Sequence, residues 1–538
     1  MKKNIKMAAV ACMLLSAFAT VSCDKNTDNG GENPPQGETF ELGDGSKDNF
    51  EIASDMTLTY PNVYTLKGFV YVPDGVTLTI EPGVVIKGDK ATQGTLIIER
   101  GGKIMAQGTP ERPIVFTSAQ APGSRKPGDW GGIILLGKAP NNLGEQTIEG
   151  GVRSKHGGND PADNSGVLSY VRVEFPGIEY STDNEINGIT FGSVGSGTKI
   201  DHLQVSYSGD DSYEWFGGTA NAKYLVAYSG WDDDFDTDNG FSGKVQFAMG
   251  VRNPRIGDKS ASNGFESDNN GDGAATEPYT SCVFANVSLF GPVSNPASYT
   301  EQAGAEGSPV DARFQAALHL RRNTQLSIYN SLIAAFPVGL IIENDKGSTT
   351  QDWAEQGKLN VTNCVMAGMV KNYQDAQYWK DGSQFDDEDA GSFADGYFNR
   401  AEGGNRVFAA LSDLGLSGNP LSLSAPVVFP GSDSPLASGA AWTEEKVASG
   451  FDKVDYIGAF GPNETAVANW TSAGAISTPR IRFTKRRQVG QFVGGRAAAA
   501  VRPFPVPRRS FRCAGNACGD CVPCRNITAR GLRQSRPP

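Results

Sequence analysis

The chain has 538 residues, a formal net charge of -12, 66 glycines and only 3 histidines. A chain of this length and glycine content accommodates several domains or one repeat array rich in tight turns. The acidic balance argues against a nucleic-acid partner, and three histidines argue against a multi-histidine metal site. After the N-terminus no apolar run is long enough to indicate a polytopic membrane protein.

The N-terminal region predicts export and anchoring. Three lysines precede a short apolar run at 7–18 and a small-residue stretch that ends in Cys23. The pattern resembles a bacterial lipoprotein signal, with Thr20 where Leu is usual. It implies removal of 1–22, lipidation of Cys23 and an outer-membrane lipoprotein that faces the periplasm or the cell surface. A cleaved secretory peptide with a structural cysteine is the alternative, and residues 23–49, polar and Gly/Pro-rich, are expected to form a flexible tether.

From residue 50 to about 370 the chain consists of short apolar runs that end at glycine. GVTLTIEPGVVIKG, GTLIIERGGKIMAQG, INGITFGSVG and AKYLVAYSG are examples, and no helical pattern of comparable length separates them. Such runs predict short β-strands, which can close into a sandwich, a barrel, a propeller or a solenoid.

An internal repeat favours the solenoid. The run 205–209 (VSYSG) recurs at 226–230 (VAYSG), and the residues that follow each copy also match, with a period of roughly 21 to 22 residues. One coil of a parallel β-helix needs about that many residues, and equivalent positions then stack at about 4.8 Å. Stacking predicts an inward aromatic ladder and, beside it, a column of mutually repelling carboxylates that needs a counter-ion or raised pKa values. The ladder comprises Tyr213, Phe235 and Phe265, and the column comprises Glu214, Asp236 and Glu266.

Several longer motifs carry a family resemblance. LTIEPGVVIKG, GGKIMAQGTPERPIVFTS and GDWGGIILLGKA, and later SGDDSYEWFGG and GFDKVDYIGAFG, resemble segments of Bacteroidetes-type right-handed parallel β-helix surface lipoproteins. The resemblance covers most of residues 50–472. It implies an all-β fold, a right-handed parallel β-helix with a pectate-lyase-like architecture, and says little about activity because this fold hosts lyases, hydrolases, adhesins and inert stalks alike.

The acidic middle of the chain is a candidate Ca²⁺ site. Oxygen ligands at alternate positions of a tight turn suit Ca²⁺, and two stretches, 234–240 and 268–273, have that spacing. Neither stretch has the Glu that completes an EF-hand. Residues of neighbouring coils would therefore have to supply the remaining Ca²⁺ ligands. Solvated acidic turns that bind nothing are the alternative. The candidate metal ligands are Asp234, Asp236, Asp238, Asp268, Asn270, Asp272, Glu214 and Glu266.

Cations follow the acidic column in the sequence. His319 and Arg321 are expected on one face of the next coil and Arg322 on the other. Polysaccharide lyases of this fold combine Ca²⁺ with a Lys or Arg base, so Arg321, Glu266 and Asp211 are the catalytic candidates. An Arg-carboxylate salt bridge that ends the column is the alternative reading. Three aromatic residues, which could also be simple packing residues, are candidates for a sugar-stacking platform: Trp215, Trp231 and Tyr228.

The last two segments of the chain, 371–472 and 473–538, lack the regular spacing of short apolar runs. Residues 371–472 are expected to contain the end of the β-helix and a mixed C-terminal cap that closes the open end of the solenoid. Residues 473–538 turn abruptly to Arg, Ala and Pro and contain a C-x4-C-x2-C-x2-C cluster that would ordinarily indicate zinc or an iron-sulfur centre. A shifted reading of codons for 473–485 can instead encode a typical family ending, WSNFDPANTVY and a stop. We therefore interpret 473–538 as a frameshifted, disordered tail.

Two functions remain open at this stage. The first is a monomeric, calcium-stabilised surface binding or structural module that presents one face to a polysaccharide or another envelope component. The second is a calcium-dependent polysaccharide lyase or other glycan-active enzyme. The sequence favours the first because it offers no complete catalytic set.

Overall fold

The structure, a computed structural model, describes residues 37–182, 184–299, 310–311, 313–376, 391–465 and 468–472. The predicted signal segment, Cys23 and the tail 473–538 lie outside these residues. In the part of the chain that is described, no helix combines the length and the apolar character needed to cross a membrane.

Strands dominate the fold. The larger sheet contains β1 (Thr39–Leu42), β2 (Met56–Leu58), β3 (Val63–Leu66), β5 (Thr77–Ile80), β6 (Val85–Gly88), β8 (Lys103–Gln107), β9 (Ile114–Ser118), β13 (Gly166–Glu174), β17 (Lys199–Ser206), β19 (Ala222–Tyr228), β21 (Lys244–Val251), β23 (Val283–Phe290), β25 (Ser327–Tyr329), β26 (Leu332–Ala334), β28 (Asn360–Thr362), β29 (Val365–Ala367) and β31 (Arg406–Phe408). The second sheet contains β4 (Phe69–Val72), β7 (Thr95–Ile98), β10 (Ile133–Leu136), β16 (Ile189–Val194), β18 (Tyr213–Gly218), β20 (Phe235–Asp238), β22 (Phe265–Ser267), β24 (Ala316–Leu320), β27 (Val338–Ile342) and β30 (Lys371–Gln374).

Smaller elements decorate these sheets. Two hairpins pair β11 (Gln146–Thr147) with β12 (Lys155–His156) and β14 (Glu179–Ser181) with β15 (Asn184–Glu185). The α-helices are α1 (Thr350–Glu355) and α2 (Phe393–Phe398), and the short 3-10 helices are η1 (Pro296–Ser298), η2 (Asp345–Gly347), η3 (Ala401–Gly403), η4 (Leu411–Leu414) and η5 (Glu445–Val447).

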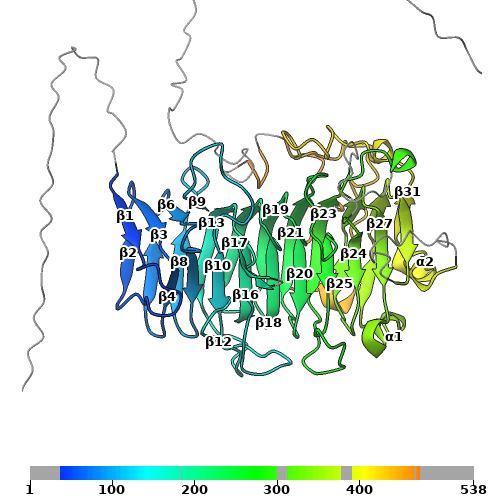
Figure 1. The fold of residues 1–538 in the computed structure, drawn as a ribbon. Helices are drawn as coiled ribbons and strands as arrows, with labels where there is room; N and C mark the ends of the chain where they lie inside the picture. Colours follow the sequence, from blue (N-terminus) through cyan, green and yellow to red (C-terminus); the bar gives the residue numbers. More distant parts are fainter. Residues whose placement is uncertain are drawn as a thin grey trace, which may run out of the picture. The chain divides into compact units, whose positions relative to one another are not determined.

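Each coil of the chain contributes one strand to each of three faces. β2, β3 and β4 are followed by β5, β6 and β7, and each strand pairs in parallel with its equivalent in the next coil. Figure 1 shows these coils stacked in sequence order, from β1 in blue to β31 in yellow. The predicted right-handed parallel β-helix is confirmed.

The larger sheet forms two of these faces, joined at a corner. β13 pairs with β8 through its first half and with β9 through its second half, so it bends where the two halves meet. A column of residues with left-handed backbone marks this corner from coil to coil, and their positive φ turns the chain between the faces. The column comprises Tyr170, His202, Tyr224, Phe247, Asn286, Asn330 and Asn363. We call the β2–β5–β8 side the first face, the β3–β6–β9 side the second face, and the ten-stranded sheet the third face.

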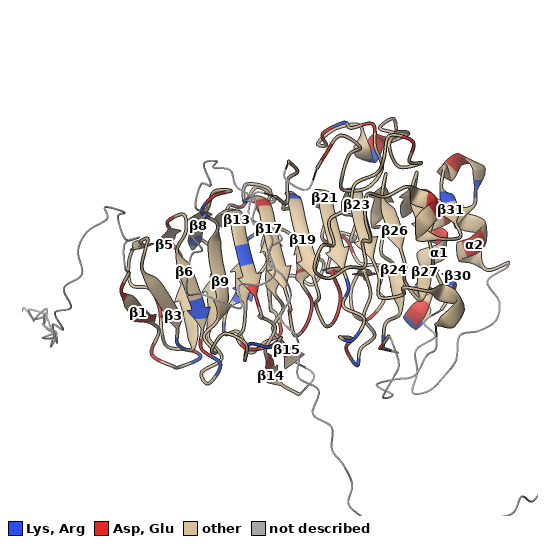
Figure 2. Ribbon diagram, turned by 90° about the horizontal axis from the view of Figure 1, so that it is seen from above, with Lys and Arg blue, Asp and Glu red and all other residues tan. Residues whose placement is uncertain are grey.

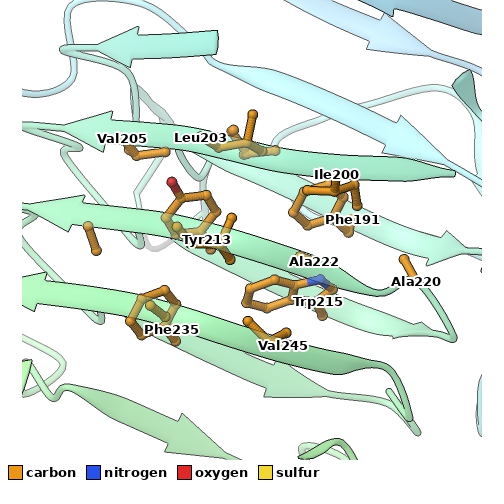
Figure 3. Close-up of a cluster of buried hydrophobic side chains, with 14 of the residues drawn as sticks. Phe191, Ile200, Leu203, Val205, Tyr213, Trp215, Ala220, Ala222, Phe235 and Val245 are labelled. Atoms are coloured by element: carbon orange, nitrogen blue, oxygen red, sulfur yellow. The ribbon is translucent and has the colours of Figure 1, made fainter. Parts of the chain in front are cut away.

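The interior contains the predicted aromatic ladder. Tyr213, Phe235 and Phe265 lie in register on β18, β20 and β22, with ring centroids 5.6 and 5.1 Å apart. All three are fully buried, and Trp215 and Phe191 continue the stacking beside them (Figure 3). The parallel register brings like side chains together even though the coil before Phe265 is longer than the one before Phe235. Buried aromatic surface of this kind is a major stabilising contribution.

The β-helix begins before the predicted boundary at residue 50. β1 lies inside the segment predicted to be a tether and pairs with β3, because its alternating residues 39–42 add one more strand to the second face. At the other end, β30 and β31 continue the third and second faces inside the segment 371–472, which was expected to contain the end of the β-helix.

The segment expected to hold the cap, residues 371–472, contains, besides its strands, α2 and the C-terminal segment, which comprises residues 409–465 and 468–472. α2 packs against β27 and β30, the last strands of the third face, and η4 contacts β31. The C-terminal segment packs along the outside of the second face, where Phe429, Ile457 and Phe460 cover a stripe of buried apolar residues. The physical reason is that this stripe, which includes Val226 and Met249, would otherwise be a large exposed apolar patch.

Candidate cation-binding site

Outward-facing residues of the third face form the predicted acidic column. Glu214 is in register with Asp236, which is in register with Glu266, and the next position is His319. The strand period places each of these side chains opposite the buried aromatic ladder. The predicted stacking of like charges on successive coils is therefore confirmed. Charges are sparse elsewhere on the strands, and many acidic residues colour the turns (Figure 2).

The turns that enter these strands add a second row of carboxylates. Asp211 Oδ1 accepts a hydrogen bond from the backbone N–H of Asp233 at 2.8 Å. Asp233 in turn accepts one from the backbone N–H of Asn263 in the following coil. This ladder fixes the turns, since each carboxylate satisfies an amide of its neighbour, and it holds both aspartates beside the column.

Together these residues bring carboxylate oxygens unusually close. Three groups each offer three oxygens that lie within 4.8 Å of one another, and Asp211 and Asp236 belong to two groups each. The groups are Asp210, Asp211 and Asp232; Asp211, Glu214 and Asp236; and Asp233, Asp236 and Glu266. We call these seven residues, together with Glu149, the acidic cluster.

Burial and mutual repulsion disturb the titration of the acidic cluster. Burial, reinforced by neighbouring carboxylates, raises the pKa of Asp211, Glu214 and Asp236 well above the usual range. The same causes raise the pKa of Asp232 to about 7. Without a cation these groups therefore hold protons at pH values where free carboxyls are ionised.

The cluster also contains buried polar atoms without a hydrogen-bond partner in the described structure. Asp236 Oδ1 and Asn187 Oδ1 are two of them. Asn187 is 1% exposed, and its amide N–H donates to Glu149 at 3.1 Å and to Glu214, so the side chain lies in the cluster. Unpartnered oxygens among carboxylates form an all-oxygen donor set, which fits Ca²⁺.

Arginines terminate the cluster on its C-terminal side. Arg321 donates to Glu266 and, through Nε at 2.8 Å, to Asp268. Although burial works against ionisation of Glu266, Arg321 and His319 lower its pKa to about 2. Burial likewise opposes the charged form of Arg321, but its carboxylate partners raise its pKa. The arginine therefore neutralises the last carboxylates of the column.

Arg322 differs from the sequence prediction. It lies beside Asp268, to which Nη1 donates at 2.6 Å, on the same side as Arg321. Strand alternation does not apply there, because β24 has ended and Arg322 has a left-handed backbone with φ of 48°. His319, as predicted, stays next to Glu266 and also contacts Glu343 at 2.9 Å.

Several predicted ligands lie outside the acidic cluster. Asp234 points away from it and pairs with buried Arg252 at 2.9 Å. Asp238 lies two residues beyond Asp236 on β20, where its pKa is raised by burial and by Asp268. Asn270 accepts from the backbone of Ala274 at 2.9 Å, and Asp272 is exposed. The EF-hand-like stretch 268–273 thus does not gather its oxygens.

Sequence reasoning missed part of the cluster. Asp232 and Asp233 were visible in the sequence as an acidic run. Their position beside the column depends on the geometry of the turns, which the sequence pattern does not predict. Glu149 and Asn187 carried no signal, because Glu149 reaches the column from a segment between β11 and β12.

Of the candidate sugar platform, Trp215 and Tyr228 are buried in packing, whereas Trp231 is 41% exposed next to Asp232.

Three strands per coil with parallel pairing define the chain as a parallel β-helix. The chain belongs to the family of pectate-lyase-like β-helix domains, whose family model matches residues 50–402. No curated protein and no solved structure gives a significant match to the chain. The family defines the architecture, and the site must be interpreted from its own residues.

Proposed function

We propose that this protein binds Ca²⁺ in the acidic cluster and acts as a surface binding or structural module for a polysaccharide or another envelope component. In this proposal it is a monomeric lipoprotein held at the outer membrane through Cys23. The observation that carries the proposal is the sharing of Asp211 and Asp236 among three groups of closely spaced carboxylate oxygens. Several negative charges at this distance are stable together only when they are protonated or neutralised by a cation.

Each of the three groups supplies three carboxylate oxygens, and the shared residues Asp211 and Asp236 connect the groups. Ca²⁺ accepts six to eight oxygen ligands in a flexible shell, so carboxylates from two coils are compatible ligands. A bound Ca²⁺ would cross-link neighbouring coils and neutralise the column. Asp211, Glu214 and Asp236 would hold it, while the Asp211–Asp233 ladder keeps the turns in place.

A binding module is favoured over a calcium-dependent polysaccharide lyase. A lyase needs a base that can give up its own proton to solvent and then accept one from the sugar. Arg321, the candidate base, is held in its charged form by Glu266 and Asp268, which makes it a poor proton acceptor. The acid candidates Glu266 and Asp211 are likewise engaged, with Arg321 and with the backbone of Asp233.

Calorimetric titration with Ca²⁺ tests the cation proposal. We expect saturable binding with a dissociation constant of about 10⁻³ M or tighter, as in extracellular calcium modules, and weaker binding of Mg²⁺. The double variant Asp211→Asn plus Asp236→Asn should abolish it, and the exposed Glu111→Gln variant should not. Unchanged titration of the double variant would overturn this assignment.

Two further assays address the rest of the proposal. Incubation with polygalacturonate and Ca²⁺ should produce no ultraviolet absorbance from unsaturated uronate ends, and its appearance would establish the lyase instead. Labelling cells with an alkyne fatty acid should mark the wild-type protein and not Cys23→Ser. Equal labelling of both proteins would refute the anchor.

A further inference from the structure

A second recess lies on the first face, on a different sheet from the acidic cluster. It has a volume of about 430 Å³ and runs over the first residues of β17, β19 and β21. Gly450 and Phe451 of the C-terminal segment form its far wall. Because three successive coils and a covering segment build it, the recess is a fixed groove of a size typical of ligand sites. We call it the lysine groove.

Three coils each contribute a lysine to this groove: Lys199, Lys223 and Lys244. The register pairs Asp201 with Lys223 and Lys223 with Gln246. Adjacent strands lie about 4.8 Å apart, so the three ammonium groups project from backbone positions within roughly 10 Å along the solenoid. In a chain of net charge -12, this is a local concentration of positive charge.

Nearby acids reduce this positive charge but do not cancel it. Asp201 is the one carboxylate in the groove lining, and Lys199 lies 3.2 Å from it. Burial works against its ionisation, yet His202, Ser169 and Lys199 lower the pKa of Asp201 to about 2. Asp452 pairs with Lys223 at 2.7 Å. Three lysines face two carboxylates, and the lysines remain partly exposed, with Lys199 at 65% and Lys223 at 32%.

Aromatic rings border the same groove. His202 stacks on Tyr224 at 4.4 Å, and Tyr224 stacks on Phe247 at 5.2 Å. Because these rings cover one another's faces, they present their edges at the groove. Phe451 lies opposite, with Lys244 Nζ 5.4 Å from its ring centre. Small polar residues, Ser196 and Thr198 among them, complete the lining.

We propose that the lysine groove binds an acidic saccharide, a sugar chain that carries carboxylate or sulfate groups. The lysines match its charges, the aromatic edges match its C–H surfaces, and the small polar residues match its hydroxyls. A flat membrane surface fits less well, since the C-terminal segment walls the groove on one side. The choice of a saccharide rests on the proposed function, whereas the site is separate from the acidic cluster.

The test uses calorimetry on the full chain at low salt in EDTA, so that Ca²⁺ cannot bridge a ligand to the acidic cluster. The probes are oligogalacturonate, a sulfated galactan oligosaccharide, a neutral galactan oligosaccharide and vesicles that contain phosphatidylglycerol. We expect binding of one or both acidic probes and none of the neutral one. Binding of the carboxylated or the sulfated probe alone would identify the anionic group.

Lys199→Ala plus Lys223→Ala should weaken binding about tenfold or more, as expected from losing charge-assisted contacts. Lys199→Arg plus Lys223→Arg should retain binding, as should Lys103→Ala, a change at an exposed lysine of β8 on the same face. A melting curve checks that each variant is folded. The Asp211→Asn plus Asp236→Asn variant should bind the saccharide normally, which separates failure of this site from failure of the calcium proposal.

Four results would overturn the proposal: no binding of either acidic probe, equal binding of the neutral probe, unchanged affinity of the alanine variant, or binding to the vesicles alone.

Discussion

Glu214 and Asp236 occupy equivalent positions of adjacent coils, and both side chains point out of the third face. Burial raises the pKa of each, Asp236 and other carboxylates add to the rise at Glu214, and Glu266 and Asp233 add to the rise at Asp236. The repetition that stacks the aromatic ladder inside the solenoid therefore also stacks repelling carboxylates outside it. Repulsion between these two carboxylates lowers the free energy of unfolding of the cation-free protein.

Removing one member of this pair should stabilise the cation-free protein. In EDTA at pH 8 we expect Asp236→Asn to raise the free energy of unfolding by on the order of 1 kcal/mol, since each pKa unit corresponds to about 1.4 kcal/mol. Addition of Ca²⁺ should raise the free energy of unfolding of this variant by less than it raises that of the wild type. Urea unfolding with and without Ca²⁺ measures both effects, with Glu111→Gln as the control; destabilisation in EDTA would contradict the account.

The stability of the cation-free protein should fall as the pH rises. The raised pKa values mean that the folded protein holds protons which the unfolded chain has released, so the free energy of unfolding decreases with pH. The decrease should begin above about pH 4, the usual carboxyl range, and continue through about pH 7, where Asp232 titrates.

Glu266 has the opposite dependence, because its lowered pKa contributes stability that is lost as the pH falls toward about 2. Melting temperatures in EDTA should therefore be highest near pH 4 to 5, and the increase produced by Ca²⁺ should be larger at pH 8 than at pH 5. A melting temperature that rises steadily from pH 5 to 8 in EDTA would be incompatible with this arrangement.

Arg321 should be a structural partner of the carboxylates. Arg321→Ala leaves Glu266 and Asp268 with one cation fewer, and breaking such a pair typically destabilises by about 3–5 kcal/mol. Arg255, which is exposed, provides the control, and Arg255→Ala should change stability little. If chemical denaturation gave equal stability for both variants, the ion pairs would not hold this end of the cluster.

The C-terminal segment should be part of the stable fold. Phe460 is 3% exposed and stacks on Trp470 at 5.3 Å against the second face. We expect Phe460→Ala to destabilise the protein by about 3–5 kcal/mol, as for other buried phenylalanines. Phe40→Ala, at a 41% exposed ring, should have a much smaller effect. Calorimetric melting compares the two, and equal melting temperatures would argue that the segment packs loosely.

The coil repeat explains how much could be read from the sequence. Tyr213 and Phe235 were aligned correctly because each coil repeats the same side-chain pattern, and that alignment alone placed Glu214 beside Asp236. Contacts that do not repeat could not be found this way. Glu149 reaches the column from a non-repeating segment. The C-terminal segment folds back along the second face, guided by apolar surface that strand patterns do not reveal.

The turns were the other source of error. Regular alternation predicts which way a side chain points only within a strand. Arg322 follows the end of β24 with positive φ, and Asp234 precedes β20, so alternation misplaced the first and spacing misplaced the second. The row formed by Asp211 and Asp233 likewise depends on hydrogen bonds between turns.

Anomalous diffraction from crystals grown in Ca²⁺ tests the central claim most directly. We predict an anomalous peak within bonding distance of oxygens from Asp211, Glu214 and Asp236, at about 2.3–2.6 Å. A map that shows Ca²⁺ only at other positions, or none at all in a protein saturated with the ion, would contradict it.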